Sequence, residues 1–285
     1  MARLTMSALV LLCCAAATAL VPTSAFAVDG VVLINQNSVT TGLGGCDAPG
    51  FPLTLCHPGS YRLSGNLNVG SVNTTAIQIT VNNITLDLNG FTISGPVVCT
   101  PGSFPVPCTG HGNGVGINSA KNNITVRNGT VRGMGLAGIN FTGLGALVED
   151  VHAESNAGVN SAAISVLDGI VTHCTVGTNA GTGISAGAFD STVSFNNVIF
   201  NGGFGILGGA MVSNNNASLN GNDGINNAAN ILYNTLHRNG GFAISLSSFT
   251  FAFSGYMGNV MIDNVKGNAS GGHSMGNNLC NGSAC

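Results

Sequence analysis

Residues 193–244 read VSFNNVIFNGGFGILGGAM, VSNNNASLNGNDGINNAAN and ILYNTLHRNGGFAI when each new line starts at the branched apolar residue that opens a copy of a common pattern. The three lines begin at Val193, Val212 and Ile231, which are 19 residues apart. In each line an asparagine follows eight positions after the first residue, and a (Gly/Ala)-Ile step ends five positions after that asparagine. This regularity is an internal repeat, and it decides the fold.

The repeat continues toward the N-terminus in longer and looser copies. In the earliest copy Met134 stands where the asparagine is expected, while the copy that starts at Val171 keeps the full pattern. Intervals of 22, 23, 22, 19 and 19 residues with shared aligned positions are hard to obtain by chance. The first residues of the six copies are Val126, Val148, Val171, Val193, Val212 and Ile231.

A unit of about 20 residues that holds several short β-branched segments between Gly/Asn turns cannot be a helical hairpin. A leucine-rich repeat would show a regular leucine ladder, which this sequence lacks. The remaining solution is a parallel β-solenoid, in which each unit is one coil and its strands pair with those of the coils above and below. Asparagines at one repeat position would then stack along the axis, with their amides bonding to one another.

The segment from Ile84 to Gly95, ITLDLNGFTISG, and coil turns such as NGGFGI at 201–206 resemble the right-handed parallel β-helix proteins of the pectin-lyase-like superfamily. The resemblance covers about residues 60–268. It implies an all-β fold, a right-handed parallel β-helix of about eight coils with capping segments.

The resemblance does not extend to the catalytic motifs of that superfamily. Of the polygalacturonase motifs only Gly110-His111-Gly112 occurs, and it lies early, inside an inserted loop. Calcium-dependent lyases of this fold crowd acidic residues into one column, whereas here arginines are interspersed among the acidic residues. We therefore expect no metal site and no cofactor; calcium is the one possible ion, and no acidic cluster supports it.

Composition excludes several classes of protein. The chain has 285 residues, with 43 glycines and 36 asparagines but only 7 basic and 10 acidic residues. So much Gly and Asn disfavours helices and coiled coils. The absence of a Lys/Arg cluster argues against nucleic-acid binding. A hydrophobic share of 44% is enough for a core, so the chain is folded.

Five segments are expected along the chain. Residues 1–27 have an apolar run and a small-x-small end at Ala25-Phe26-Ala27, which indicates a cleaved secretory signal peptide. No later run is long enough to span a membrane. Residues 28–75 are expected to form an N-terminal cap, 76–268 the β-helix, 96–113 a Pro-rich inserted loop, and 269–285 a C-terminal cap. The protein is thus expected to be secreted, periplasmic or on the cell surface, and monomeric.

Six cysteines of the mature chain fall into pairs that are close in sequence, which favours short disulfide loops in an oxidising compartment. No CxxC-type spacing suggests a metal site. Cys174 is left over in an apolar-patterned stretch, where a buried and inert thiol is expected. The pairs expected from proximity alone are Cys46 with Cys56, Cys99 with Cys108, and Cys280 with Cys285.

Aligning the coils on the repeat places residues at equal offsets in columns, about 4.8 Å apart per coil. Charge then concentrates in the first coils, beside the inserted loop. The candidate binding or catalytic cluster consists of Asp87, Arg127, Arg132, Glu149, His152 and Glu154.

Two interpretations of this cluster remain open. In the first, a polysaccharide lies along the face and the arginines hold its carboxylates, as bidentate guanidinium groups can. A lyase acting on uronates by β-elimination would add a base, His152 or an arginine. In the second, the charges are ordinary cross-strand pairs on a solvated face. Because the enzyme motifs are missing, we expect a secreted or surface β-helix that binds an extracellular polysaccharide or cell-surface glycan, with a polysaccharide lyase as the alternative.

Overall fold

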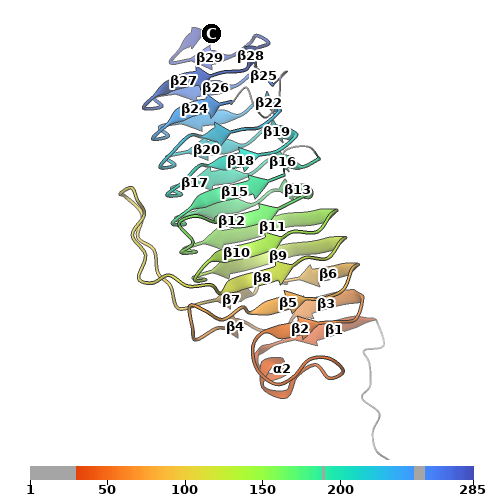
Figure 1. Cartoon of the computed structure of the whole chain (residues 1–285). Coiled ribbons are helices and arrows are strands. Elements are labelled where there is room, and N and C mark those ends of the chain that lie inside the picture. The colour runs from red at the N-terminus through yellow and green to blue at the C-terminus, as the bar shows by residue number, and fades with distance from the viewer. Residues whose placement is uncertain (1–29, 188–189, 247–253) are drawn as a thin grey trace, which may run out of the picture.

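Three strands per turn, stacked turn upon turn, make the chain a parallel β-helix, as the repeat predicted (Figure 1). It is right-handed, as the resemblance implied. The computed structural model describes residues 30–187, 190–246 and 254–285, and the expected signal peptide lies outside them. One of the three faces contains ten strands, so the solenoid has about ten turns, against about eight expected.

The three faces follow one another around each turn and are named here face 1, face 2 and face 3. The strands β9 (Ile124–Arg132) and β11 (Ala146–Glu154) pass without a break from face 1 to face 2. Face 1 further contains β1 (Val31–Ile34), β3 (Gly59–Leu63), β6 (Ile84–Asp87), β13 (Gly169–Thr172), β16 (Thr192–Ser194), β19 (Met211–Ser213), β22 (Asn230–Leu232), β25 (Gly255–Met257) and β28 (His273–Ser274).

Faces 2 and 3 are built in the same way, from short parallel strands. Face 2 further contains β4 (Leu67–Asn68), β7 (Thr92–Ser94), β14 (Thr175–Gly177), β17 (Asn197–Ile199), β20 (Asn216–Ser218), β23 (Thr235–His237), β26 (Val260–Ile262) and β29 (Leu279–Cys280). Face 3 contains β2 (Leu53–Leu55), β5 (Ile77–Ile79), β8 (Val115–Ser119), β10 (Ala137–Phe141), β12 (Ala162–Val166), β15 (Thr182–Ala186), β18 (Ile206–Gly208), β21 (Ile225–Asn226), β24 (Phe242–Ser245) and β27 (Gly267–Ser270).

The core is a set of aligned apolar columns, because equal offsets in successive coils point to the same place inside the solenoid. The branched residues that open each repeat pair with one another on face 1, and all are fully buried. The isoleucine of the (Gly/Ala)-Ile step forms the matching column of face 3. That column runs from Ile77 through Ile117, Ile139, Ile164, Ile184, Ile206 and Ile225 to Ile244.

Buried asparagines form two ladders along the axis. One lies at the corner between faces 2 and 3, where the amide Nδ2 of Asn201 donates to Oδ1 of Asn220 at 3.0 Å. The other lies at the corner between faces 1 and 2, where Nδ2 of Asn196 donates to Oδ1 of Asn215 at 3.0 Å. Every amide in a ladder points in the same direction. The first ladder contains Asn156, Asn179, Asn201, Asn220, Asn239 and Asn264; the second contains Asn196, Asn215, Asn234, Asn259 and Asn278.

Both ends of the solenoid are covered by short irregular segments. The helix α2 (Gln36–Thr41), capped by the side chain of Asn35, lies at the N-terminal end. At the other end β30 (Ser283–Ala284) pairs with β29 in antiparallel fashion and covers that strand. Paired strands extend into both segments expected to be caps, since β1 to β4 precede residue 76 and β28 to β30 follow residue 268. In the described ranges no helix is long and apolar enough to cross a bilayer.

Candidate polysaccharide-binding surface

The structure brings most of the expected charged residues into the columns that the repeat predicted. Asp87 pairs with Arg127 on adjacent strands of face 1, and Arg127 pairs with Glu149. Arg132 and Glu154 are neighbours on face 2, and His152 lies between the two columns, next to Thr130 and Thr175. The loop 96–113 leaves the same region of the solenoid, between β7 and β8.

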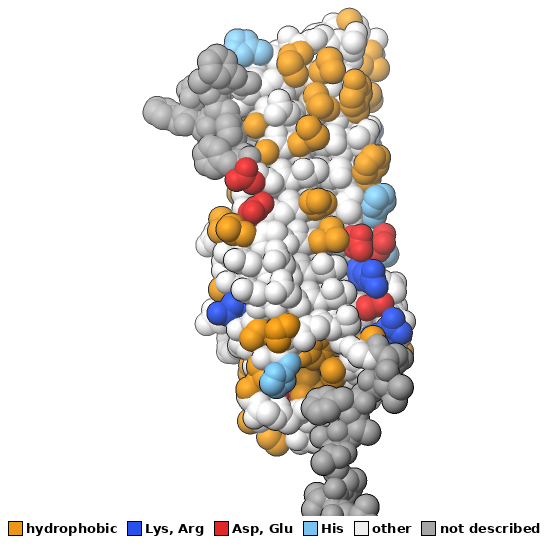
Figure 2. All heavy atoms as spheres, turned by 90° about the vertical axis from the view of Figure 1, so that its right-hand side faces the viewer, with side chains coloured by type: hydrophobic (Ala, Val, Ile, Leu, Met, Phe, Trp, Pro, Cys, Tyr) orange, Lys and Arg blue, Asp and Glu red, His pale blue; other side chains and the backbone are white. Residues whose placement is uncertain are grey.

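The charges of this cluster neutralise one another. Arg62, which sequence reasoning missed, precedes Asp87 in the same column, so basic and acidic residues alternate over four coils. Nε of Arg62 and Nε of Arg127 lie 3.7 and 3.8 Å from Oδ2 of Asp87, and a guanidinium nitrogen of Arg127 lies 4.0 Å from Oε1 of Glu149. Figure 2 shows acidic and basic side chains along one edge of the N-terminal half, with mostly apolar side chains above them.

The second column repeats this arrangement. A guanidinium nitrogen of Arg132 lies 3.6 Å from Oε1 of Glu154, and both side chains are about half exposed. The side chain of His152 is exposed and makes no hydrogen bond to the described part of the chain. Each arginine of the cluster therefore already has a carboxylate partner, which favours the interpretation as cross-strand ion pairs.

Asp87 is the centre of the column of ion pairs on face 1. Its side chain is only 13% exposed, and its Oδ1 also accepts the backbone N–H of Asn89 at 2.8 Å. The amide of Asn128 donates to the same oxygen at 3.2 Å. A carboxylate held by two arginines and two N–H donors has a structural role, since its oxygens are occupied by these neighbours rather than by a ligand.

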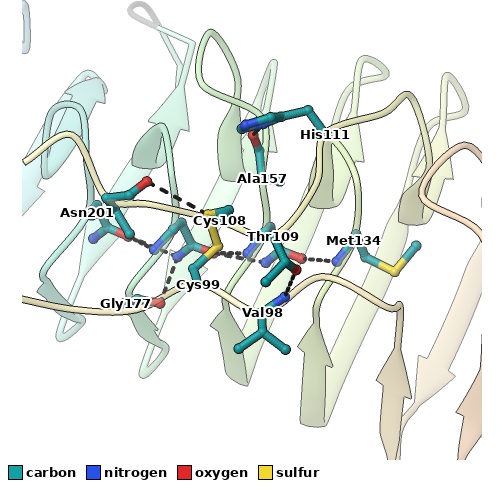
Figure 3. Close-up of a disulfide and its surroundings, with 12 residues drawn as sticks. Val98, Cys99, Cys108, Thr109, His111, Met134, Ala157, Gly177 and Asn201 are labelled. Atoms are coloured by element: carbon teal, nitrogen blue, oxygen red, sulfur yellow. Dashed lines mark hydrogen bonds between the residues drawn. A yellow bond between two sulfur atoms is a disulfide. The ribbon is translucent and has the colours of Figure 1, made fainter.

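The inserted loop packs along the corner between faces 2 and 3. Val97 and Val106 are buried and form a small apolar cluster with Cys99 and Ala157. Figure 3 shows the Cys99–Cys108 disulfide beside the row of amide hydrogen bonds of the first ladder, with the ring of His111 turned toward Ala157. Nδ1 of His111 lies 2.8 Å from the carbonyl oxygen of Ala157. His111 is thus used in holding the loop.

The tip of this loop reaches several coils further along. A Cβ atom on Gly221 would lie 3.0 Å from Cδ1 of Phe104, so the Phe104 ring lies against this glycine. Gly221 occupies the same corner position as Ala157, three coils later, which is about 14 Å along the axis. The small residues at this position leave room for the loop beside the edge of face 2.

An open groove of about 470 Å³ lies on face 2, beyond the charged coils; its exposed surface is mostly apolar, and polar side chains contribute a small part of it. Two columns line it, formed by residues at alternate positions of the face 2 strands. Leu219 and Ile262 complete its lining. The columns are Asn197, Asn216 and Thr235, and beside them Ile199, Ser218 and His237.

Several polar groups of this groove are free to bind a ligand. The Nδ2 of Asn216 donates to Oδ1 of Asn197 at 2.8 Å. The Nδ2 of Asn197, the hydroxyl of Thr235 and the ring of His237 make no hydrogen bond to the described part of the chain. No acidic, Lys or Arg side chain lines the groove. The nearby Arg238 is paired with Asp263 at 3.8 Å.

The three expected disulfides are present. Cys46 is bonded to Cys56, Cys99 to Cys108 and Cys280 to Cys285. Cys174 is a free, buried thiol at the head of the second asparagine ladder, where its backbone N–H donates to Oδ1 of Asn196 at 2.9 Å. Desolvation by burial raises the pKa of this thiol to about 12, so it is inert at neutral pH.

Other sites of chemistry are not evident in the described ranges. No group of three or more His, Cys, Asp or Glu side chains there could hold a metal ion. A larger cavity, of about 700 Å³, lies between the N-terminal segment and the first coil. It is lined largely by glycines and apolar side chains such as Val32 and Leu43, with the buried Tyr61 at one wall.

No protein-family model and no curated protein matches this chain. Among solved structures it is similar to the A-module of the Azotobacter vinelandii mannuronan C-5 epimerase AlgE6, with 12% identity, a TM-score of 0.37, and coverage of 77% of this chain and 80% of that one. It is also similar to the Dettilon tailspike protein gp208, with 15% identity, a TM-score of 0.38, and coverage of 77% and 61%. It is similar as well to ORF18 of Geobacillus virus E2, with 12% identity, a TM-score of 0.41, and coverage of 86% of this chain and 55% of that one. These are likenesses of fold alone, and the chain is a right-handed parallel β-helix repeat protein.

Proposed function

We propose that this chain is a secreted or cell-surface protein that binds an uncharged extracellular polysaccharide along face 2, without cleaving it. The observation that carries the proposal is the groove on face 2, where the Nδ2 of Asn197, the hydroxyl of Thr235 and the ring of His237 have no hydrogen-bond partner in the described part of the chain. An extended glycan presents hydroxyls at regular intervals along its length, and such groups exchange hydrogen bonds with neutral side chains of this kind.

The charge of the surface argues against a uronate as the ligand. A uronate polymer would need free cations along the groove, and the arginines of the charged cluster are already paired with carboxylates. Binding a uronate there would separate Arg127 from Asp87 or Arg132 from Glu154 and leave a carboxylate without its partner. A β-elimination would also need an unpaired cation beside a base to neutralise the enolate.

Affinity gel electrophoresis of the purified protein tests this function. Gels should contain galactomannan, xyloglucan or mixed-linkage glucan as uncharged probes, and pectate or alginate as uronate probes. We expect at least one uncharged probe to slow the protein, with no new reducing ends and no ultraviolet absorbance from unsaturated ends. The variants Asn197→Ala and Thr235→Ala should each weaken retention roughly threefold to tenfold, because each loses one hydrogen bond to the ligand.

Arg132→Ala is the matched control, since it lies on the same face several coils before the groove and should be retained like the wild type. Retention by pectate or alginate alone would overturn the proposal. So would the release of unsaturated or reducing ends, which would identify an enzyme. Retention that is unchanged in both groove variants would show that the glycan binds elsewhere.

A further inference from the structure

Exposed aromatic side chains line the corner between faces 1 and 2. One residue of each coil at this corner has a left-handed backbone, and its N–H donates to the carbonyl that precedes the equivalent residue of the next coil. These bonds run from Phe195 to Ser213, from Asn214 to Leu232 and from Tyr233 to Met257. The corner column thus reads His173, Phe195, Asn214, Tyr233 and Gly258, and its aromatic members are named here the aromatic ridge: His173, Phe195 and Tyr233.

Neither the backbone nor the core explains why aromatic residues occupy this ridge. A left-handed conformation is unfavourable for a bulky side chain, while Asn tolerates it. Asn128 and Asn214 occupy equivalent corner positions with φ of 60° and 58°, so the fold itself is satisfied by asparagine there. Phe195 and Tyr233 are each 56% exposed, so they contribute little to the core. Exposed aromatics that the fold does not need indicate a binding surface.

Between Phe195 and Tyr233 the corner column has one position that no aromatic ring covers. The imidazole of His173 stacks on the ring of Phe195, with centroids 5.4 Å apart and planes within 6°. At the other end a Cβ on Gly258 would lie 2.5 Å from Cδ1 and Cε1 of Tyr233, so the Tyr233 ring lies against this glycine. Between them stands Asn214, which is exposed and whose side-chain amide has no hydrogen bond within the described chain. Phe195 and Tyr233 therefore bracket Asn214 at a separation of two coils, about 9.6 Å.

The ridge borders the groove on face 2. Phe195, Asn214 and Tyr233 lie two residues before Asn197, Asn216 and Thr235, which form the near column of the groove. The loop tip at Phe104 lies at the opposite edge of face 2, beside Gly221. A polymer in the groove would thus have the ridge along one side and the loop along the other.

We propose that the aromatic ridge is the stacking wall of this groove and selects uncharged hexopyranose chains whose rings present flat C–H faces. One sugar ring would lie between Phe195 and Tyr233, over Asn214, whose amide would bond to its hydroxyls. A spacing of two coils is comparable to a disaccharide repeat in an extended β-linked chain, so alternate rings meet an aromatic group. This inference rests on the proposed function and names the substrate class of the same surface.

Replacement by asparagine is the sharpest perturbation, because the column already carries Asn at equivalent positions. Phe195→Asn and Tyr233→Asn should keep the backbone and the fold, which a thermal melt checks. Each should weaken retention by the best uncharged probe roughly tenfold, since each removes one aromatic face. Tyr233→Phe keeps the ring and should bind within about twofold of the wild type.

Tyrosine fluorescence supplies a second measurement. The chain has no tryptophan and three tyrosines, of which Tyr61 is buried, Tyr256 half-buried and Tyr233 exposed. Acrylamide should therefore quench mainly Tyr233, and the bound probe should protect it from quenching. In Tyr233→Phe that protection should disappear while retention in the gel persists.

The outcomes separate the two proposals. Loss of retention in both asparagine variants, with retention kept in Tyr233→Phe, supports the stacking wall. Wild-type retention that is unchanged in Phe195→Asn and Tyr233→Asn overturns the stacking wall and leaves binding by the groove intact. No retention of the wild type by any uncharged probe overturns the proposed function, and the inference fails with it.

Discussion

The asparagine ladders should contribute a large share of the stability, and Asn215→Ala tests this directly. Nδ2 of Asn215 donates to the carbonyls of Val193 and Ser213 and to Oδ1 of Asn234, at 2.9, 3.0 and 3.0 Å. Its Oδ1 accepts the backbone N–H and the side-chain Nδ2 of Asn196, at 2.9 and 3.0 Å. The side chain is buried and belongs to the second ladder.

The cost of the substitution follows from these bonds. Alanine leaves the buried backbone N–H of Asn196 without an acceptor, at about 2 kcal/mol. It also removes the two amide–amide bonds, to Asn196 and to Asn234, at about 1 kcal/mol each. The free energy of unfolding should therefore fall by about 4 kcal/mol, which corresponds to a urea midpoint lower by roughly 1–2 M.

Urea unfolding followed by far-ultraviolet circular dichroism, with the disulfides intact, measures the effect. Asn216→Ala is the control at the neighbouring position, because the exposed side chain of Asn216 bonds only to the side chains of Asn197 and Ser218. Its free energy of unfolding should fall by less than about 1 kcal/mol. Asn215→Asp conserves shape but turns an acceptor toward the carbonyls of Val193 and Ser213, so at neutral pH it should lose more stability than alanine does. Equal midpoints for Asn215→Ala and Asn216→Ala would refute the reasoning.

Two further predictions concern the ion-pair ladder and the buried thiol. Asp87→Asn should lower the free energy of unfolding by about 1–2 kcal/mol, because Asp87 is nearly buried between two arginines. Glu154→Gln should lower it by less than about 0.5 kcal/mol, because Glu154 is half exposed. Equal urea midpoints for the two variants would contradict the structural role of Asp87. Burial holds the pKa of Cys174 at about 12, against 9.0 for an ordinary thiol. The unfolded chain therefore ionises this thiol first, and stability should fall as the pH rises from 9 toward 12. Urea midpoints at pH 8 and pH 10 should differ more for the wild type than for Cys174→Ser, and an identical difference would show that the thiol is not responsible.

The register of the solenoid could be predicted from the sequence because a fixed repeat length converts an offset into a column. The spacing of Val126, Val148 and Val171 was enough to align Arg127 with Glu149 and Arg132 with Glu154. Arg62 was missed because its coil lies before the regular repeats, where Tyr61 and Leu86 pair across 25 residues and Leu86 and Val126 across 40.

The second asparagine ladder was also missed, although a signal for it exists. Asn196, Asn215 and Asn234 follow the opening residues of their coils by three positions, as regularly as the first ladder follows by eight. Cys174 occupies the same offset in the coil before them, which explains why the left-over cysteine is buried: its Sγ lies 3.7 Å from the carbonyl oxygen of Val148, where a ladder amide would bond.

The aromatic ridge was hidden by composition. The chain has no tryptophan and only three tyrosines, yet the structure places Phe195 and Tyr233 at one exposed corner. Their common offset, two residues after the opening residue, is visible in the sequence. That this offset turns outward depends on the left-handed corner, which only the folded backbone reveals. The path of the loop to Gly221 likewise depends on tertiary packing.

The two asparagine ladders make the solenoid a modular object whose length changes in whole steps. Because Val193, Val212 and Ile231 are separated by the same number of residues, excising residues 193–211 would bring Val212 into the place of Val193 and Asn215 into that of Asn196. Both ladders, the isoleucine column and the column of left-handed residues would again be continuous. The solenoid would be one coil, or about 4.8 Å, shorter. Duplicating the same unit would lengthen the groove by an equal step. A protein built in this way can match its reach to a longer or shorter ligand by copying coils, without redesigning its core.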